Sequence, residues 1–212
     1  MLAGCRRVLV LACGGCVSVC LTGGEKQADI LASQLRLAAK ARGQEMDAQS
    51  DCITRQCDRE FFADLKADPA GFDAVLSIAC GVGVGYMSEL YPAVRVLPGL
   101  DTTFYGANVG PGQWQEYCHG CGQCMLAWTG GICPIARCAK SLVNGTCGGT
   151  KDGKCEVSPE MDCGWYLIYQ KLKAAGRLDE LLAIRPPPDW AKDRSGGLRR
   201  MSVEELADLG KE

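Results

Sequence analysis

Eight of the fifteen cysteines lie between Cys118 and Cys163, and three of them open this block in the run Cys118-His119-Gly120-Cys121-Gly122-Gln123-Cys124. Two residues separate each of these three thiols, a spacing with which one short loop can supply three ligands to a [4Fe-4S] cluster. The other thiols of the block are Cys133, Cys138, Cys147, Cys155 and Cys163. Thiols at this density either bind metal or form disulfides, so the choice between the two decides the chemistry.

The composition favours metal. Disulfide scaffolds are typical of short secreted chains, whereas this chain has 212 residues and is 47 % apolar, enough for a hydrophobic core. Arg6 and Arg7 precede an apolar run, Val8–Ala12, but five residues are fewer than the roughly 7–15 of a signal segment. No stretch approaches the roughly 20 apolar residues of a membrane span. We therefore expect a cytoplasmic protein, in which reducing conditions favour metal-bound or catalytic thiols.

The eight thiols of the block match two four-ligand sites, which could be two clusters or one cluster and one zinc ion. The run of three needs a fourth thiol from elsewhere. Cys133 precedes a proline, as does the cysteine that closes the bacterial ferredoxin run, and Cys163 could equally complete the site. Zinc alone remains an alternative, because paired thiols two residues apart also suit tetrahedral zinc. His119, the only histidine, is interpreted as a neighbour of the site or a surface residue.

A second group of thiols lies nearer the N-terminus and comprises Cys13, Cys16, Cys20, Cys57 and Cys80. Cys13, Cys57 and Cys80 follow three predicted strands, and the ends of parallel strands meet at one edge of a sheet, where ligands bind. Any four of the five could hold a cluster. The alternatives are that Cys80 is only a small buried residue, or that Cys13 and Cys16 form a thioredoxin-like redox pair. Cys52 is interpreted as a bystander.

The elements that position these thiols form an α/β fold over residues 1–105. The apolar run 6–12 predicts a strand buried on both faces, followed by a loop over 13–24. Thr22 and Glu25 fit a capping box for a helix ending near Arg42, with Gly43 after it. Further strands are predicted at 45–50, 74–78 and 93–97, and helices at 58–66 and 85–90. The alternation predicts a parallel sheet of the Rossmann or flavodoxin-like type.

Residues 106–190 are rich in Gly, Cys, Pro and Asn and show little periodicity before Trp165. A segment with so few large apolar residues needs a metal or cross-links to fold, so it is predicted to be a small metal-stabilised domain. Helices are predicted at 164–176 and 178–184. Residues 191–212 form a charged tail.

No catalytic residue is predicted. No Ser-His-Asp or Cys-His arrangement is proposed, because the chain has a single histidine. Gly81, Gly83 and Gly85 lack the spacing of a dinucleotide-binding fingerprint. The net charge of −2 has both signs mixed along the chain, so nucleic-acid binding is not expected, and no substrate pocket is evident.

The segments 129–149, TGGICPIARCAKSLVNGTCGG, and 153–157, GKCEV, are specific enough to identify a family. With the loop 13–25, Cys57-Asp58 and Cys80-Gly81, they resemble the cysteine-rich MetV-type subunit of methylenetetrahydrofolate reductase, also found as a C-terminal domain in related proteins. The resemblance covers nearly all of residues 5–190. Thr146 stands where proline is expected, and the residues around Cys57 depart from the usual ones, although every thiol is kept.

The resemblance implies an iron–sulfur subunit with two or three [4Fe-4S] clusters and possibly zinc in one site. Its partner would be the MetF-type subunit, which carries the flavin, FMN or FAD, and binds the folate. The complex reduces methylenetetrahydrofolate to methyltetrahydrofolate in one-carbon metabolism. The cysteine-rich subunit would deliver electrons to the flavin from ferredoxin or from another redox partner, such as a hydrogenase or a heterodisulfide-reductase-like subunit. The alternative is a zinc-stabilised scaffold subunit of the same complex, without electron transfer.

Overall fold

The computed structural model describes residues 1–103 and 105–193, which form two compact units that divide after Thr103. The predicted tail, residues 191–212, lies mostly outside the described residues. Within them, no helix combines the length and the apolar character needed to cross a lipid bilayer.

The first unit contains a four-stranded parallel sheet, as the alternating pattern predicts. Its strands are β1 (Arg7–Cys13), β2 (Asp47–Ile53), β3 (Ala74–Ser77) and β4 (Val96–Pro98), in the order β2-β1-β3-β4. This is the order of the first four strands of a flavodoxin-like sheet. β1 has a strand on each side, and all its residues after Arg7 are buried, which confirms a strand covered on both faces.

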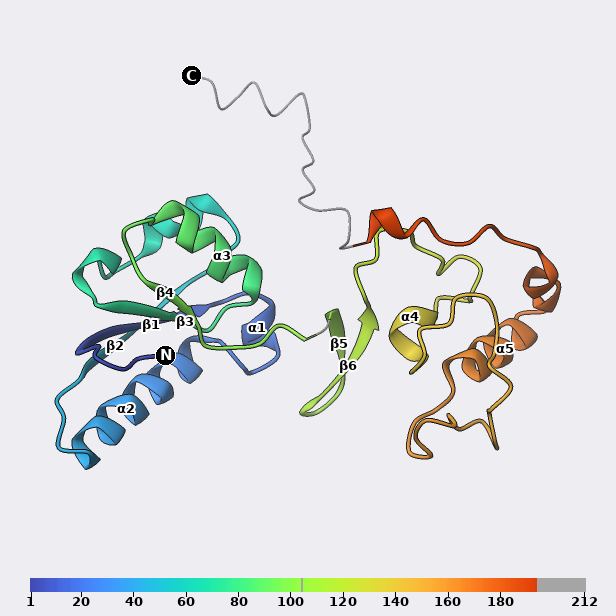
Figure 1. Cartoon of the computed structure of the whole chain (residues 1–212), viewed down its shortest axis with the longest axis horizontal. Coiled ribbons are helices and arrows are strands. Elements are labelled where there is room, and N and C mark those ends of the chain that lie inside the picture. The colour runs from blue at the N-terminus through green and yellow to red at the C-terminus, as the bar shows by residue number, and fades with distance from the viewer. Residues whose placement is uncertain (104, 194–212) are drawn as a thin grey trace, which may run out of the picture. The chain divides into compact units, whose positions relative to one another are not determined.

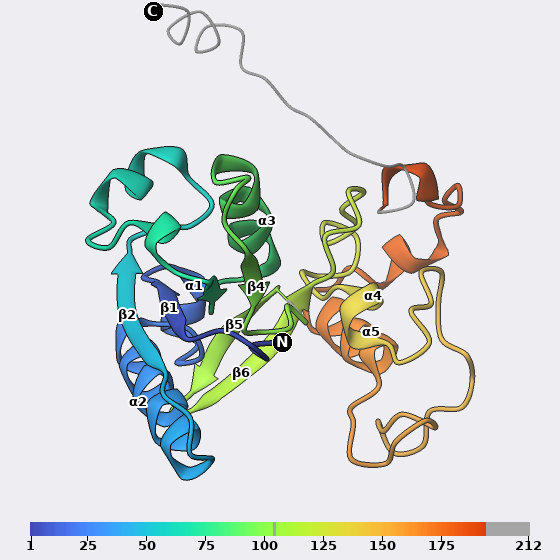
Figure 2. The same cartoon turned by 60° about the vertical axis from the view of Figure 1, so that its left-hand side comes forward.

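Side chains alternate across β1 and build a core on each face of the sheet. Val10 and Ala12 pack against helix α2 (Glu25–Ala41), which covers one face. Leu9 and Leu11 belong to the opposite core, with Met87 of helix α3 (Gly81–Leu90). Figures 1 and 2 show α2 and α3 on opposite sides of the sheet. The first unit is therefore a three-layer α/β arrangement.

Three helical predictions in the first unit needed correction, and two short helical segments were not predicted. Thr22 does not cap α2: its hydroxyl donates to the Val17 carbonyl, and the cap residue is Gly24, which enters the helix in extended conformation. The helix predicted at 58–66 is a 3-10 helix, η1 (Arg59–Asp64), and α3 begins four residues earlier than predicted. The loop 13–24 contains a short helix, α1 (Cys16–Val19). A second 3-10 turn, η2 (Pro69–Gly71), precedes β3.

Strands β2 and β4 begin two and three residues later than predicted, respectively. The shift in β2 has a tertiary cause, because its pairing with β1 runs from Arg7 opposite Asp47 to Cys13 opposite Ile53. Gly43 adopts a positive φ of 67° just after α2, as its predicted role at the helix end requires.

The second unit opens with an antiparallel hairpin, β5 (Tyr105–Gly110) and β6 (Gln113–Cys118), which was not predicted. The Pro111-Gly112 dipeptide in its turn was the available signal, and Gly112 has a φ of 70°. The remaining elements are α4 (Pro134–Arg137), α5 (Gly164–Ala174), and the 3-10 helices η3 (Leu178–Leu182) and η4 (Trp190–Lys192). The helix predicted at 178–184 is therefore the shorter η3.

One face of α5 forms the apolar cluster of the second unit, as its periodicity predicts. Trp165, Ile168 and Leu172 are buried there together with Cys163. The indole N–H of Trp165 donates to the Leu142 carbonyl at 2.9 Å, which fastens the glycine-rich loop to the helix.

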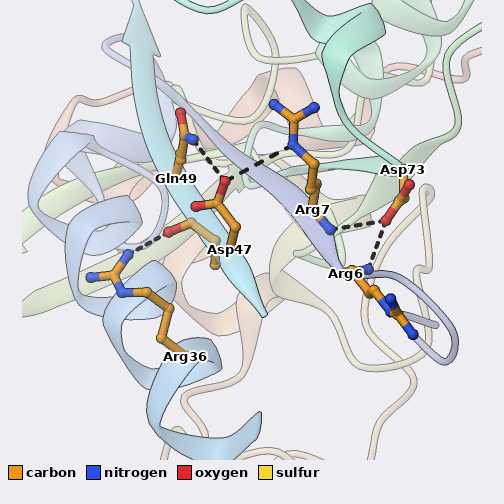
Figure 3. A network of polar contacts seen from close by, with 7 residues as sticks. Arg6, Arg7, Arg36, Asp47, Gln49 and Asp73 are labelled. Atoms are coloured by element: carbon orange, nitrogen blue, oxygen red, sulfur yellow. Dashed lines mark hydrogen bonds and ion pairs between the residues drawn. The ribbon is translucent and has the colours of Figure 1, made fainter. Parts of the chain in front are cut away.

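At the amino edge of the sheet, Asp73 joins the starts of β1 and β3. One oxygen of its carboxylate accepts the backbone N–H groups of Arg6 and Arg7, at 2.7 and 2.9 Å. Beside it, Asp47 accepts from Gln49 at 3.0 Å and lies 4.0 Å from the Arg7 guanidinium, as Figure 3 shows. The hydrogen bonds from Arg7 and Arg6 lower the pKa of Asp73 below its usual value.

We expect Asp73→Ala to lower the free energy of unfolding at pH 7. Because the pKa of Asp73 is lowered by folding, its contribution is present above the ordinary carboxyl pKa of about 4 and disappears as the pH falls through the lower folded-state pKa. The difference between Asp73→Ala and wild type in urea unfolding should therefore narrow below about pH 4. Asp73→Asn, which keeps an acceptor oxygen without the charge, is the control. A difference for Asp73→Ala that stays constant down to pH 2 would contradict this assignment.

Candidate metal centre

The five candidate thiols of the first unit lie at the carboxyl edge of the parallel sheet. Cys13 is the last residue of β1, Cys57 lies in the connection after β2, and Cys80 is the cap residue at the start of α3, shortly after β3. Cys16 and Cys20 begin and follow the short helix α1, which leaves the end of β1. Three connections that are distant in sequence thus bring thiols to the edge at which open α/β sheets bind ligands.

The loop 14–24 is held tightly against this edge. The amide of Cys13 donates to the Gly23 carbonyl at 3.0 Å, and the amide of Gly14 donates to the Ile53 carbonyl at 2.9 Å. A Cβ atom at Gly23 would collide with the carbonyl oxygen of Ile78, so a side chain cannot be placed there without moving the backbone. The pairing of Gly23 with Cys13 consequently fixes the position of the thiol loop.

Cys13, Cys16 and Cys80 interact electrostatically. The pKa of Cys16 is raised by burial first, and then by the thiols of Cys80 and Cys13. Thiolates that lie this close repel one another, and a bound cation would remove the repulsion. The raised pKa is opposite to the lowered thiol pKa that a thioredoxin-like Cys13–Cys16 pair would need.

Cys52, predicted to be a bystander, lies near the same group. Its pKa is raised by burial, then by Glu25 and then by Cys13. Cys5, to which no role was assigned, is buried at the other end of the sheet, where the Arg95 guanidinium lies 3.6 Å from its sulfur. These two cysteines therefore provide internal comparisons for the proposed ligands.

In the second unit, Cys118 ends β6, and Cys121 and Cys124 follow in the next loop. Gly120 and Gly122 have φ angles of 72° and 82°, in the left-handed region that favours glycine, and they allow the loop to turn tightly between the thiols. The amide of Gly120 donates to the Cys118 sulfur at 3.4 Å. His119 lies beside Glu116, with 3.9 Å between its Nδ1 and the carboxylate.

Three of the five later thiols lie at the ends of α4 and the start of α5, and the other two lie in the loops between these helices. Cys133 and Cys138 cap the two ends of α4, and Cys163 is the cap residue of α5. Cys138 packs against the cluster that contains Cys163, and the Thr150 hydroxyl donates to the Cys163 sulfur at 2.9 Å. The Cys147 sulfur lies 3.7 Å from the Glu156 carboxylate, and Cys155 is paired through its amide with the Met161 carbonyl.

All fifteen cysteines are free thiols, and no disulfide joins them. Within residues 1–103 and 105–193, no three His, Cys, Asp or Glu side chains are arranged so that they could hold a single metal ion. The structure thus brings thiol-bearing segments close to one another, and binding of a metal would require their sulfur atoms to move closer together.

Two features of the site were missed from the sequence. Gln56, which precedes Cys57, is completely buried and hydrogen-bonded at the sheet edge, and a lone glutamine carries no sequence signal for such a role. The second is a cavity of about 320 Å³ in the second unit, at the lower end of the size range of ligand pockets, where no pocket was evident from the sequence. Its lining includes Thr129, Trp165, Tyr166, Tyr169 and Arg185.

Comparison with known protein families gives one match. Residues 97–191 match the family described as "Methylene-tetrahydrofolate reductase C terminal". No curated protein and no solved structure matches the chain. The matched segment covers the block of eight thiols and relates this part of the chain to methylenetetrahydrofolate reductase. The thiols at the sheet edge of the first unit lie outside it.

The tight seat of Gly23 leads to a stability prediction. Gly23→Ala should lower the free energy of unfolding by about 1–3 kcal/mol, because the added methyl group must displace the backbone at the Ile78 carbonyl. Gly85→Ala is the matched control: no atom lies within 4 Å of its Cβ position inside α3, and alanine there should be neutral or stabilising by up to about 1 kcal/mol. Urea unfolding of both variants makes the comparison. Equal effects of the two substitutions would show that Gly23 is not constrained as described.

Proposed function

We propose that the chain is an iron–sulfur electron-transfer subunit that works with the flavin-carrying subunit of a methylenetetrahydrofolate reductase. The observation that carries the proposal is the placement of thiol-bearing segments together, at the sheet edge of the first unit and at the ends of α4 and the start of α5 in the second. The family match of residues 97–191 supports the relation to the reductase.

The donor sets suit iron–sulfur clusters in their chemistry. At the sheet edge the candidate ligands are Cys13, Cys16, Cys20, Cys57 and Cys80. After burial, Cys80 and Cys13 contribute to the raised pKa of Cys16. In the second unit, two sets of four can be drawn from Cys118, Cys121, Cys124, Cys133, Cys138, Cys147, Cys155 and Cys163. Thiolates are the usual ligands of [4Fe-4S] clusters, and such a cluster takes up and gives back one electron at a time.

Groups that donate hydrogen bonds to these sulfur atoms are present before any metal binds. The Gly120 amide donates to Cys118, and the Thr150 hydroxyl donates to Cys163. Hydrogen bonds to ligand sulfur raise the reduction potential of a cluster, because they stabilise the more negative reduced state. The chain can therefore tune electron acceptance with its own residues, while the substrate chemistry belongs to the flavin of the partner.

Zinc in the second unit is the second candidate, as part of a scaffold subunit without electron transfer. It is favoured by the small size of the apolar cluster around α5, whose four buried residues include Cys163 itself. A domain with so small a core gains most from a structural metal. The two candidates differ in the metal that the purified chain would contain.

Elemental analysis of the anaerobically purified chain tests the main proposal. We expect iron and acid-labile sulfide in equal amounts, at four or more of each per chain, because each [4Fe-4S] cluster contributes four iron and four sulfide ions. The double variant Cys57→Ser/Cys80→Ser leaves only three of the five candidate thiols at the sheet edge and should lower the iron content by one cluster, whereas Cys5→Ala, at the opposite end of the sheet, should leave it unchanged. Less than one cluster per chain after reconstitution would refute electron transfer, and stoichiometric zinc would establish the scaffold alternative.

Removal of one ligand in the second unit should also cost stability. Cys121→Ser is expected to lower the free energy of unfolding of the metal-loaded protein by on the order of 2–4 kcal/mol, a fraction of the free energy with which structural metals bind. The control is the metal-free protein, in which Cys121→Ser and wild type should melt alike. If the substitution has the same effect with and without metal, Cys121 acts through packing and is not a ligand.

A further inference from the structure

A buried carboxamide lies between the ends of β1 and β3. Gln56 is completely buried, and its Nε2 donates to the carbonyl oxygens of Leu11 and Ala12, at 3.0 Å each. Its Oε1 accepts the hydroxyl of Ser77 at 2.7 Å. Both amide hydrogens and the carbonyl oxygen of the side chain therefore have partners, as a buried polar group requires.

The network continues from Ser77 to the start of α3. The Ser77 oxygen accepts the backbone N–H of Ala79 at 3.3 Å. Each of three linked residues immediately precedes a candidate ligand in the sequence: Ala12 precedes Cys13, Gln56 precedes Cys57, and Ala79 precedes Cys80. A single side chain thus connects three thiol-bearing segments that are more than twenty residues apart along the chain.

The close approach of α3 depends on a glycine. A Cβ atom at Gly83 would lie 2.7 Å from the Cβ of Gln56 and 2.9 Å from that of Ala79, closer than carbon atoms pack. The absence of a side chain at Gly83 lets the helix that follows Cys80 come against the residue that precedes Cys57. Packing therefore holds two of the three segments that the hydrogen bonds connect, those that precede Cys57 and Cys80.

We propose that Gln56 is a positioning residue that sets the spacing of the Cys13, Cys57 and Cys80 thiols for a metal cluster at the sheet edge. This inference rests on the proposed function. Glutamine suits the role because it donates two hydrogen bonds and accepts one. A glutamate carboxylate cannot donate to the two carbonyls, and methionine fills a similar volume without any hydrogen bond.

The test uses thiol protection in the full chain, reconstituted anaerobically with ferrous iron and sulfide. Each cysteine is alkylated and its rate is measured by mass spectrometry of its own peptide. In wild type we expect Cys13, Cys57 and Cys80 to be protected. Gln56→Met should raise their alkylation rates at least tenfold, while Cys118, Cys121 and Cys124 in the same molecules stay protected as an internal control.

Ser77→Ala tests whether the network acts as a unit. It removes the partner of the Gln56 oxygen and should give a smaller increase in alkylation than Gln56→Met. The double variant should be no worse than Gln56→Met alone, because residues that act together are not additive. Additive effects of the two substitutions would overturn the proposed network.

A stability control separates positioning from general loosening. Val75→Ala removes buried volume from the same sheet at a side chain that makes none of the network's hydrogen bonds, and it should destabilise the first unit while leaving the three thiols protected. In the metal-free chain, Gln56→Met should speed amide hydrogen exchange at Ala79 at least tenfold, and Val75→Ala should do so much less. If the three thiols are alkylated equally fast in Val75→Ala and Gln56→Met, Gln56 acts only through general stability and the positioning role is overturned.

The outcomes distinguish this inference from the proposed function. If the wild-type thiols at the sheet edge gain no protection on reconstitution, the cluster proposed for the first unit is absent and the positioning role is overturned with it. If wild type is protected and Gln56→Met is protected equally, the cluster stands and only the role of Gln56 is overturned.

Discussion

The parallel pairing of β1 with β2 on one side and β3 on the other is the constraint on which the candidate site of the first unit depends. Because all three strands run in the same direction, their carboxyl ends lie at one edge, and the chain must leave that edge through three separate connections. Each connection carries a thiol. Burial of β1 on both faces gives the pairing its stability, so the hydrophobic core of the sheet and the placement of the thiols have the same cause.

Electrostatics then acts on the arrangement that the sheet creates. Burial, and then the nearby thiols of Cys80 and Cys13, raise the pKa of the Cys16 thiol and so favour its protonated, uncharged form. A cation reverses this balance, because it stabilises the thiolates that the protein alone disfavours. The same neighbourhood would be a poor choice for a thiol nucleophile. The raised pKa of Cys16 therefore argues against thiol–disulfide exchange at this edge of the sheet.

The second unit is held together differently from the first. It has a two-stranded hairpin, one helix of three turns and long connections, with a small apolar cluster on α5. Close backbone contacts at glycines add to this small core. A Cβ atom at Gly164 would lie 2.7 Å from the Arg137 carbonyl oxygen, so the start of α5 can contact the end of α4 only because residue 164 is a glycine. This contact brings Cys138 and Cys163 into the same cluster. Shape in this unit thus comes from backbone proximity and thiol placement more than from buried apolar area.

The sequence by itself determined the class of fold, the buried strand β1, the helix α2 and the apolar face of α5, because hydrophobic periodicity is a local signal that survives without tertiary context. It also predicted the cysteine groups, the later one from its spacing and the first from the position of its thiols after three predicted strands. Only the tertiary structure decided where β2 begins and that Gln56 lies buried between two strand ends. It likewise decided that Thr22 does not cap α2, since Gly23 must fit against the Ile78 carbonyl and the loop geometry follows from that fit. These features depend on contacts between residues far apart in the chain, and such contacts leave no pattern in the residues around them.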